Sequence, residues 1–411
     1  MQPRVWYVGL DWGSEEHAIC VLDEQGKIIA ERRVQNDTTA LDAIATSTAG
    51  SAPEHVLIGI ETPRLAIVEA LMARGYRVYS LNPKQSDRFR DRFFPAGSKD
   101  DSRDALVVGS ALRTDTHCFN LIEPEDGPKR LLRAATRADE YVDDAFRVAA
   151  NRLYAAVLVA IPTLIPLCKG ADEAWFWDLL EKLLQSSSMN VSSDVIAGIL
   201  KRHRITRHTV GDVRAVLDGA RFPLVDGVRE ATELQAGYLI EQLRFLATQQ
   251  KTATKAMARA LGALPKVGGK SDAEILMSMP GVGPATAAAL IVEGHQALVR
   301  RSLPQLRALA GVAPVTQSTG QREKRGKKKV MMRRASSIRL RNAMHHAANT
   351  ARRDPRFAPF YEKQLKSGAS RGLACRVVAD KMLTILVAML RDRVEYRPLT
   401  PTTPSSSAVE P

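Results

Sequence analysis

The chain has few cysteines, few aromatic residues and no apolar run long enough for a membrane span. Cys20, Cys118, Cys168 and Cys375 are scattered, with no Cys-x-x-Cys pair and no zinc-type spacing, which predicts reduced, mostly buried thiols. Aromatic residues are only 5% of the chain, so a broad surface for base stacking is not expected. No apolar run reaches the ~18 residues of a membrane helix, and no signal-peptide core is present. These absences predict a cytoplasmic protein without a membrane partner.

Positive charge is what the chain has in excess. Its 411 residues include 59 Lys and Arg against 45 Asp and Glu, for a net charge of +14. A protein this basic usually binds a polyanion. The length exceeds one typical domain, and 45% hydrophobic residues suffice for a sizeable core. We therefore expect several domains and a nucleic-acid partner.

Four carboxylates stand at positions that favour metal binding. Asp11 and Glu61 each end an apolar strand, and Asp101 and Asp104 lie three residues apart on one face of a predicted helix. Four such groups facing each other would repel unless divalent metal lay between them. We predict that they form one catalytic site for Mg²⁺ (or Mn²⁺), the usual arrangement for cutting or joining phosphodiesters.

Each acid taken singly has a simpler explanation. Any of them could be a helix cap or half of a surface ion pair, and Lys99 and Arg103 could neutralise Asp101 and Asp104 as ordinary neighbours. The combination of two strand ends with an i, i+3 pair favours the metal site.

The order of elements predicts an α/β domain over residues 1–125. Apolar runs around a turn at Asp23–Lys27 predict three antiparallel strands within residues 5–35, and strands alternate with helices over 38–81. A helix that carries Asp101 and Asp104 should run to about Thr114. This order is typical of a mixed sheet of the ribonuclease-H/RuvC-like type.

The remainder is expected to be mainly α-helical. Residues 126–262 are expected to form a helical or coiled-coil linker and oligomerisation region. Its alanine-rich heptad stripe over 132–156 is either an amphipathic helix packed on its own domain or a coiled coil that forms a dimer or a spacer. A glycine-rich linker over 263–270 leads to a C-terminal domain over 271–396. Residues 397–411, rich in Pro, Ser and Thr, are predicted to be a disordered tail.

Two segments of the C-terminal domain are candidates for nucleic-acid contact. Gly281 and Gly283 lie in a helix–hairpin–helix signature whose second helix would present backbone N–H groups to a phosphate, although a simple turn is the alternative. The tract Gln321–Arg334 carries a net charge of +7 and includes the apolar Val330–Met332, so we expect ordered phosphate contact rather than mere solvation. The cations of this tract are Arg322, Lys324, Arg325, Lys327, Lys328, Lys329, Arg333 and Arg334.

Together these segments resemble the DEDD transposases of bacterial insertion sequences, the family that also contains the Piv DNA invertases. Asp11, Glu61, Asp101 and Asp104 fall where the family's tetrad falls, and Lys99–Ala105 is similar to its Lys-Thr-Asp-Arg-Leu-Asp-Ala string. The Pro-Gly-Val-Gly-Pro turn and the Gly-Val-Ala-Pro-Val-Thr block resemble its transposase domain. The resemblance covers nearly the whole chain. It implies a nucleoid-associated DNA transposase or site-specific recombinase, guided by a structured noncoding RNA and acting as a homo-dimer or tetramer.

The resemblance also implies a serine nucleophile shortly after the Gly-Val-Ala-Pro-Val-Thr block. A gapless alignment places Thr319 there and a one-residue shift places Ser318, which we favour because a primary hydroxyl is less hindered. Both hydroxyls could instead only cap the turn. An unactivated serine is a weak nucleophile, so it would need the metal or a nearby base. We therefore expect the two domains to meet across a dimer or tetramer.

Three other functions compete. Asp11–Ser14 resembles the first phosphate loop of actin and sugar-kinase folds, but a second glycine-rich loop is missing from the sequence. A Holliday-junction endonuclease would use the same four carboxylates with water as nucleophile. A non-catalytic DNA-binding protein would use them only structurally.

Overall fold

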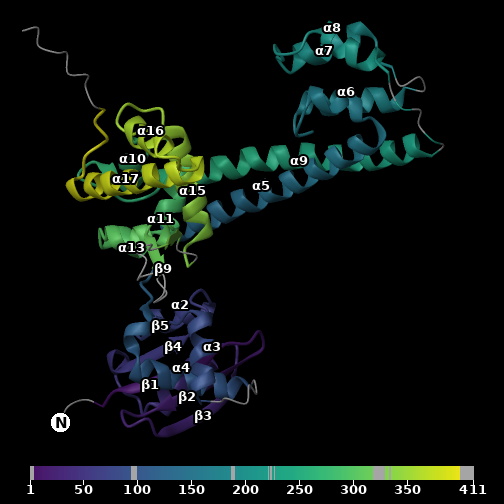
Figure 1. The fold of residues 1–411 in the computed structure, drawn as a ribbon. Helices are drawn as coiled ribbons and strands as arrows, with labels where there is room; N and C mark the ends of the chain where they lie inside the picture. Colours follow the sequence, from purple (N-terminus) through teal and green to yellow (C-terminus); the bar gives the residue numbers. More distant parts are fainter. Residues whose placement is uncertain are drawn as a thin grey trace, which may run out of the picture. The chain divides into compact units, whose positions relative to one another are not determined.

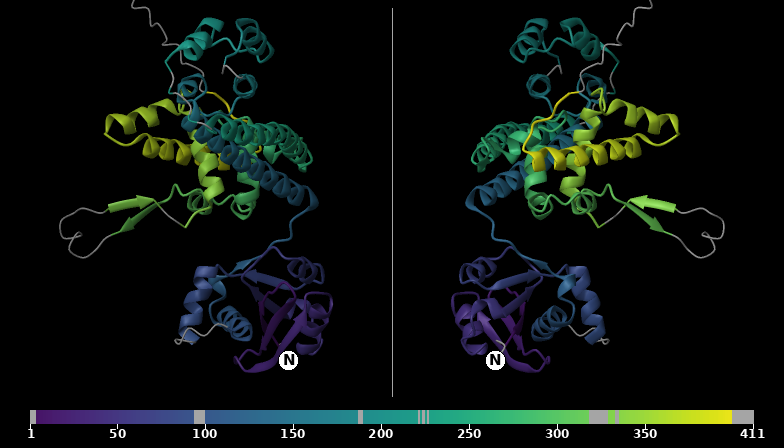
Figure 2. Two further views of the ribbon diagram at one scale, coloured as in Figure 1. Left: turned by 90° about the vertical axis from the view of Figure 1, so that its right-hand side faces the viewer. Right: turned by 90° about the vertical axis from the view of Figure 1, so that its left-hand side faces the viewer.

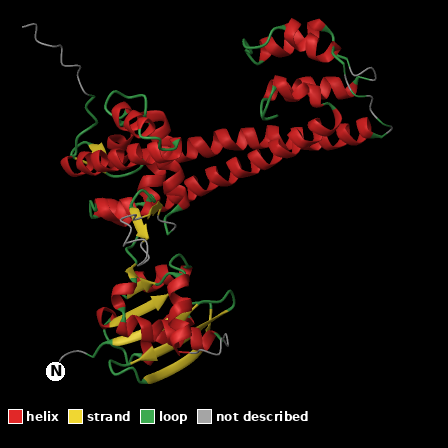
Figure 3. Cartoon of the chain, in the orientation of Figure 1, coloured by secondary structure: helices red, strands yellow, loops and turns green. Residues whose placement is uncertain are grey.

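The chain folds into two compact units, Met1–Glu125 and Asp126–Pro411 (Figure 1). The computed structural model describes residues 4–93, 100–186, 190–220, 222, 225, 227–317, 329–332 and 335–398. The first unit contains the large sheet, and the second is mainly helical (Figure 3). No helix of the described ranges is both long and apolar enough to cross a bilayer.

A mixed sheet forms the centre of the first unit, as the sequence predicts, and it has six strands. Its strands are β1 (Trp6–Asp11), β2 (Glu16–Leu22), β3 (Ile28–Gln35), β4 (Val56–Ile60), β5 (Arg77–Ser80) and β6 (Asn120–Leu121). Their order is β3-β2-β1-β4-β5-β6. The pairs β1–β4 and β4–β5 are parallel, and the others are antiparallel.

Helices cover both faces of this sheet. They are α1 (Thr39–Ser47), α2 (Ala66–Ala73), α3 (Pro83–Phe93) and α4 (Asp101–Thr114), with short 3₁₀ turns at Pro53–His55 and Thr116–Cys118. Because side chains alternate along a strand, Val8 and Leu10 of β1 enter one core with α1 and α2. Tyr7, the neighbour of Val8, packs on the opposite face, where α4 lies.

Helix α4 approaches β1 so closely that only glycine fits between them. A Cβ added to Gly9 would lie 1.8 Å from the carbonyl oxygen of Ala105 and 2.5 Å from the amide nitrogen of Gly109. Gly59 pairs with Gly9 across β1 and β4, and its added Cβ would lie 2.9 Å from Cγ1 of Val108. The two glycines therefore fix where α4 crosses the middle of the sheet.

A long helical hairpin organises the second unit. It consists of α5 (Gly127–Ala160) and α9 (Val228–Gly262), which lie side by side (Figures 1 and 2). The Asp126 side chain caps α5 by accepting a hydrogen bond from the backbone N–H of Lys129. The heptad stripe of α5 thus packs on α9 of its own chain, the first of the two predicted arrangements.

The two ends of the hairpin belong to different hydrophobic cores. At one end, Leu153 of α5 and Leu243 of α9 pack with Trp175 and Phe176. The elements there are a 3₁₀ helix (Pro162–Leu167), α6 (Ala174–Gln185), α7 (Ser193–Arg202) and α8 (Val210–Asp218). At the other end, Leu132 and Leu261 join the core of the C-terminal helices.

The C-terminal helices surround that second core. They are α10 (Asp272–Met277), α11 (Pro284–Glu293), α12 (His295–Val299), α13 (Leu303–Leu309), α15 (Ile338–Ala351), α16 (Ala358–Lys366) and α17 (Arg371–Asp392). Two short hairpins accompany them, β7 (Lys266–Val267) with β8 (Lys270–Ser271) and β9 (Pro314–Gln317) with β10 (Lys329–Met332). The first lies within the predicted glycine-rich linker over 263–270, where Gly268 and Gly269 take positive φ angles and turn the chain back on itself. The described part of the predicted tail, up to residue 398, is irregular, and the rest of it lies outside the described residues.

Replacing Gly9 by Ala should destabilise the first unit more than replacing Gly59 by Ala. The methyl group at position 9 meets the α4 backbone, which cannot rotate away, whereas at position 59 it meets the Val108 side chain. Overpacking a core costs about 1–3 kcal/mol, so we expect Gly59→Ala near the lower bound and Gly9→Ala at or above the upper one. Denaturant unfolding followed by circular dichroism measures both, and equal losses would contradict the proposed role of the Gly9 contact.

Candidate catalytic site

Strands β1 and β4 carry Asp11 and Glu61 to the same edge of the sheet. Asp11 is the last residue of β1, Glu61 directly follows β4, and the preceding residues Leu10 and Ile60 are register partners. Residues two apart on a strand share a face. Asp11 is therefore on the face of Gly9, the face against which α4 packs, and Glu61 continues the face of Gly59. Both acids are half-buried.

Helix α4 brings the other two acids to this edge. Asp101 opens the helix and is exposed, while Asp104 lies in its first turn and is only 5% exposed. Ala105, next to Asp104, packs in one apolar cluster with Ala18, the register partner of Asp11. Three elements far apart in sequence thus place the predicted carboxylates around the end of β1.

An arginine that sequence analysis did not identify lies among these acids. Arg90 of α3 donates from Nε to Oδ1 of Asp104 at 2.6 Å and from Nη1 to Oδ1 of Asp87 at 3.0 Å. The hydrogen bond to Asp104 and the charges of Asp104, Glu61 and Asp87 raise the pKa of Arg90 above its usual value. No helical spacing links Arg90 to Asp104, because the packing of α3 on α4 makes the pair. Lys99, the neighbour considered for this role, lies outside the described residues.

The chemistry of the donor set fits a hard divalent cation. Carboxylate oxygens are ligands of Mg²⁺ and Mn²⁺, and the guanidinium of Arg90 offsets only part of their charge. The four side chains do not close into a preformed cage. Within the described ranges, the group of three or more potential ligands whose atoms all lie within 4.8 Å of one another is Cys168, Asp172 and Glu173 in the second unit.

That second group is explained by ordinary structural contacts. Glu173 accepts hydrogen bonds from Arg207 at 2.5 Å and from the Trp175 indole at 3.0 Å. Burial raises the pKa of the Cys168 thiol, which keeps it protonated and a poor metal ligand. The group therefore stabilises the helices at the end of the hairpin.

The glycines of the predicted helix–hairpin–helix differ in their surroundings. Gly281 has a φ of +83°, and an added Cβ would lie 2.3 Å from the carbonyl oxygen of Ala347 in α15. Gly283, which precedes the first residue of α11, is exposed and has open space around it. Gly281 thus serves the packing of the turn on the chain's own helix. The Gly283 end is open to a ligand, and its phosphate contact remains a prediction.

The candidate nucleophile and most of the basic tract lie outside the described residues. Gln317 at the end of β9 pairs with Lys329 at the start of β10, and the two strands are antiparallel, as Figure 2 shows. The strand β10 agrees with the order expected around Val330–Met332. The candidate residues of this segment that lie outside the described ranges are Ser318, Thr319, Arg322, Lys324, Arg325, Lys327, Lys328, Arg333 and Arg334.

Replacing Arg90 by Gln should destabilise the first unit in the absence of divalent metal. It leaves the buried Asp104 carboxylate without its charged partner, which costs about 1–3 kcal/mol. If the carboxylates bind Mg²⁺, this ion should stabilise the variant more than the wild type, since the guanidinium no longer competes. Denaturant unfolding with and without MgCl₂ measures both effects.

Arg74→Gln is the matched control, because the pair of Arg74 with Asp42 is exposed and in the same unit. Exposed ion pairs contribute little, so this variant should behave as the wild type does. The same response to Mg²⁺ in all three proteins would argue against metal binding beside Arg90.

Comparison with known proteins gives consistent matches along the chain. Residues 8–162 match a DEDD-type family of IS110 elements described as transposase. Residues 273–362 match the family described as transposase IS116/IS110/IS902.

Individual relatives carry similar names. A Sinorhizobium fredii protein named as candidate transposase y4uE is 37% identical over 50% of this chain, and the match spans 58% of that protein. The Streptomyces coelicolor protein named as candidate mini-circle transposase for IS117 is 24% identical over 95% of both chains. The 42 kDa protein of insertion element IS900 from Mycobacterium paratuberculosis is 25% identical over 98% of this chain and 99% of its own.

Proposed function

The chain belongs to the DEDD transposase family of IS110-type insertion sequences, and on this premise we propose that it cuts and rejoins DNA strands by phosphoryl transfer. The observation that carries the proposal is the placement of Asp11, Glu61, Asp101 and Asp104 around one end of β1. Three separate elements supply these acids, and the tight packing of α4 on Gly9 brings two of them to the end of β1. A chance cluster of surface acids would not require such packing.

The four carboxylates are assigned to divalent metal, with Mg²⁺ or Mn²⁺ as the ion. When bound, such ions polarise the phosphate and stabilise the charge that develops on it. The carboxylates themselves orient the ions and compensate their charge. Arg90 holds Asp104 in place and must share or release this carboxylate when metal enters. Residues 1–125 are the catalytic domain in this proposal.

Ser318 is the proposed nucleophile. Its Oγ forms a bond to the phosphorus and loses its proton, while one bond from phosphorus to a deoxyribose oxygen breaks and that oxygen becomes a free hydroxyl. The phosphoester count is unchanged, so the reverse attack by a hydroxyl rejoins the strand without ATP. Support comes from the resemblance of the block before Ser318 and from the cationic tract after it.

Nucleic acid and further copies of this chain are the partners in this proposal. The basic tract of the β9–β10 segment and the Gly283 end of α11 contact nucleic-acid backbone without reading sequence. A structured RNA supplies target choice through base pairing, and the protein works as a homo-dimer or tetramer. These assignments follow the resemblance and the charge of the chain.

Asp11→Asn should reduce DNA cleavage and strand exchange by at least about 100-fold, since a metal ligand should cost no less than its supporting groups do. DNA binding and the thermal unfolding midpoint should stay close to the wild-type values. Cleavage of supercoiled DNA with Mg²⁺, with and without the cognate RNA, measures the loss. Asp42→Asn is the control, because Asp42 is an exposed acid of the same unit. Full activity of Asp11→Asn would overturn the site assignment.

Ser318→Ala should bind DNA normally and form no covalent protein–DNA adduct on a suicide substrate, because it lacks the attacking oxygen. Thr319→Ala should still form the adduct, which denaturing gel electrophoresis resolves from free protein. The opposite result would make Thr319 the nucleophile. Adducts lost in neither variant would exclude both hydroxyls and favour attack by water or a DNA 3′-hydroxyl, as in a Holliday-junction endonuclease.

A further inference from the structure

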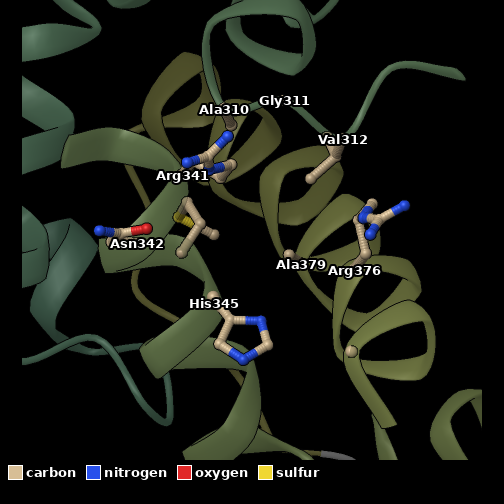
Figure 4. A pocket seen from close by; sticks show the side chains of 10 residues that line it. Ala310, Gly311, Val312, Arg341, Asn342, His345, Arg376 and Ala379 are labelled. Carbon is tan, nitrogen blue, oxygen red and sulfur yellow. The ribbon is translucent and has the colours of Figure 1, made fainter. Parts of the chain in front are cut away.

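Helices α15 and α17 enclose a cationic groove that lies apart from the predicted basic tract. Resting on the function proposed above, we propose that this groove binds the phosphodiester backbone of nucleic acid, with Arg341 and Arg376 as its principal contacts. It consists of two adjoining pockets of about 190 and 280 Å³, which share His345 and Gly372. Figure 4 shows Arg341 and Arg376 on opposite sides of the first pocket, with His345 between them at its lower edge.

The charge of the groove has one sign. Arg341, Arg376 and His345 line the first pocket, and Arg352 and Arg371 line the second. Neither pocket has a carboxylate among its lining residues. By contrast, a larger pocket of the same unit, about 650 Å³, is lined by acids of α5 as well as by basic residues. The groove is therefore suited to an anion.

Arg341 and Arg376 are cations without a counter-charge among the described residues. Both are half-buried, and neither forms an ion pair with any residue of the described ranges. Arg307 and Arg339, nearby arginines of the same unit, do form such pairs, with Asp380 and Glu140. A partly desolvated cation without a counter-charge is costly. A phosphate between the two arginines would supply the charge and accept their hydrogen bonds.

Size and backbone are compatible with a phosphate. A water molecule occupies about 30 Å³ in the liquid, so the first pocket, at about 190 Å³, has room for a phosphate group. Gly372 is the second residue of α17, a 22-residue helix. The groove thus lies at the end of α17 where backbone N–H groups and the helix dipole also favour an anion.

The groove lies close in the chain to the proposed nucleophile. Gly311 and Val312 line it, β9 begins at Pro314 and ends at Gln317, and Ser318 follows. Four strand residues span roughly 13 Å, about four nucleotide spacings along one DNA strand. A backbone held in the groove would therefore be within a few nucleotides of the start of the segment that carries Ser318.

The test measures how the affinity of the full-length protein for nucleic acid depends on salt. Fluorescence anisotropy uses labelled duplex DNA, single-stranded DNA and an RNA hairpin. Each phosphate contact contributes about 0.9 to the slope of log K against log salt on duplex DNA. Arg341→Gln with Arg376→Gln should therefore flatten the slope by about 1.8. A loss confined to DNA or to RNA identifies which polymer occupies the groove.

Two control proteins separate local contact from net charge. Arg152→Gln with Arg259→Gln removes two exposed arginines of α5 and α9 that line neither pocket of the groove, and it should change the slope far less. Arg341→Lys with Arg376→Lys keeps the charge and should retain most of the wild-type slope even if Gln at these positions impairs folding.

An unchanged slope in the groove variant, or equal losses in the groove and control variants, would overturn the groove assignment alone. A wild-type protein that binds none of the three nucleic acids would overturn the proposed function as well.

Discussion

The close contact between Gly9 and the backbone of α4 is the constraint on which the candidate site depends. It presses the helix against the middle of β1, on the face where Asp11 lies two residues further along. Gly59, the register partner of Gly9, packs against the Val108 side chain of the same helix, and Glu61, two residues further along the chain, continues its face. Asp101 and Asp104 of α4 therefore lie at the end of the two parallel strands β1 and β4. A side chain at position 9 would remove this geometry without touching any acid.

Electrostatic repulsion is the cost of such an arrangement, and Arg90 partly offsets it. Its guanidinium contacts Asp104 and is attracted by Glu61 and Asp87. The guanidinium is a planar, permanent cation that binds carboxylates well. Unlike a metal ion, it has no coordination position for a further ligand. A divalent ion carries more charge in less space, so it can compete for the same oxygens. Under the proposed function, Arg90 is thus the partner of Asp104 that an entering metal ion would displace.

The positive charge of the second unit is unevenly distributed. One face of α5 carries Asp139, Glu140, Asp143 and Asp144. Asp139 and Asp143 accept hydrogen bonds from Thr254 and Gln250 of α9, and Glu140 pairs with Arg339 of α15. The excess of arginine is left to other surfaces, among them the groove between α15 and α17. Helix packing therefore separates an acidic face of α5 from a cationic groove. A net charge of +14 alone does not reveal this separation.

The sequence by itself determined the local elements and the positions of the four acids on them. The period of a strand or helix, and the point where a strand ends, depend on neighbouring residues. The three antiparallel strands, the helix of Asp101 and Asp104 and the strand ends at Asp11 and Glu61 are of this kind. Only the tertiary structure decided which distant parts come together: it pairs Arg90 with Asp104, packs α5 on α9, and places Arg341 and Arg376 around one pocket. It also showed that the glycine-rich segment over 263–270 contains the β7–β8 hairpin. These choices depend on packing between segments far apart in the chain, and no short-range period encodes them.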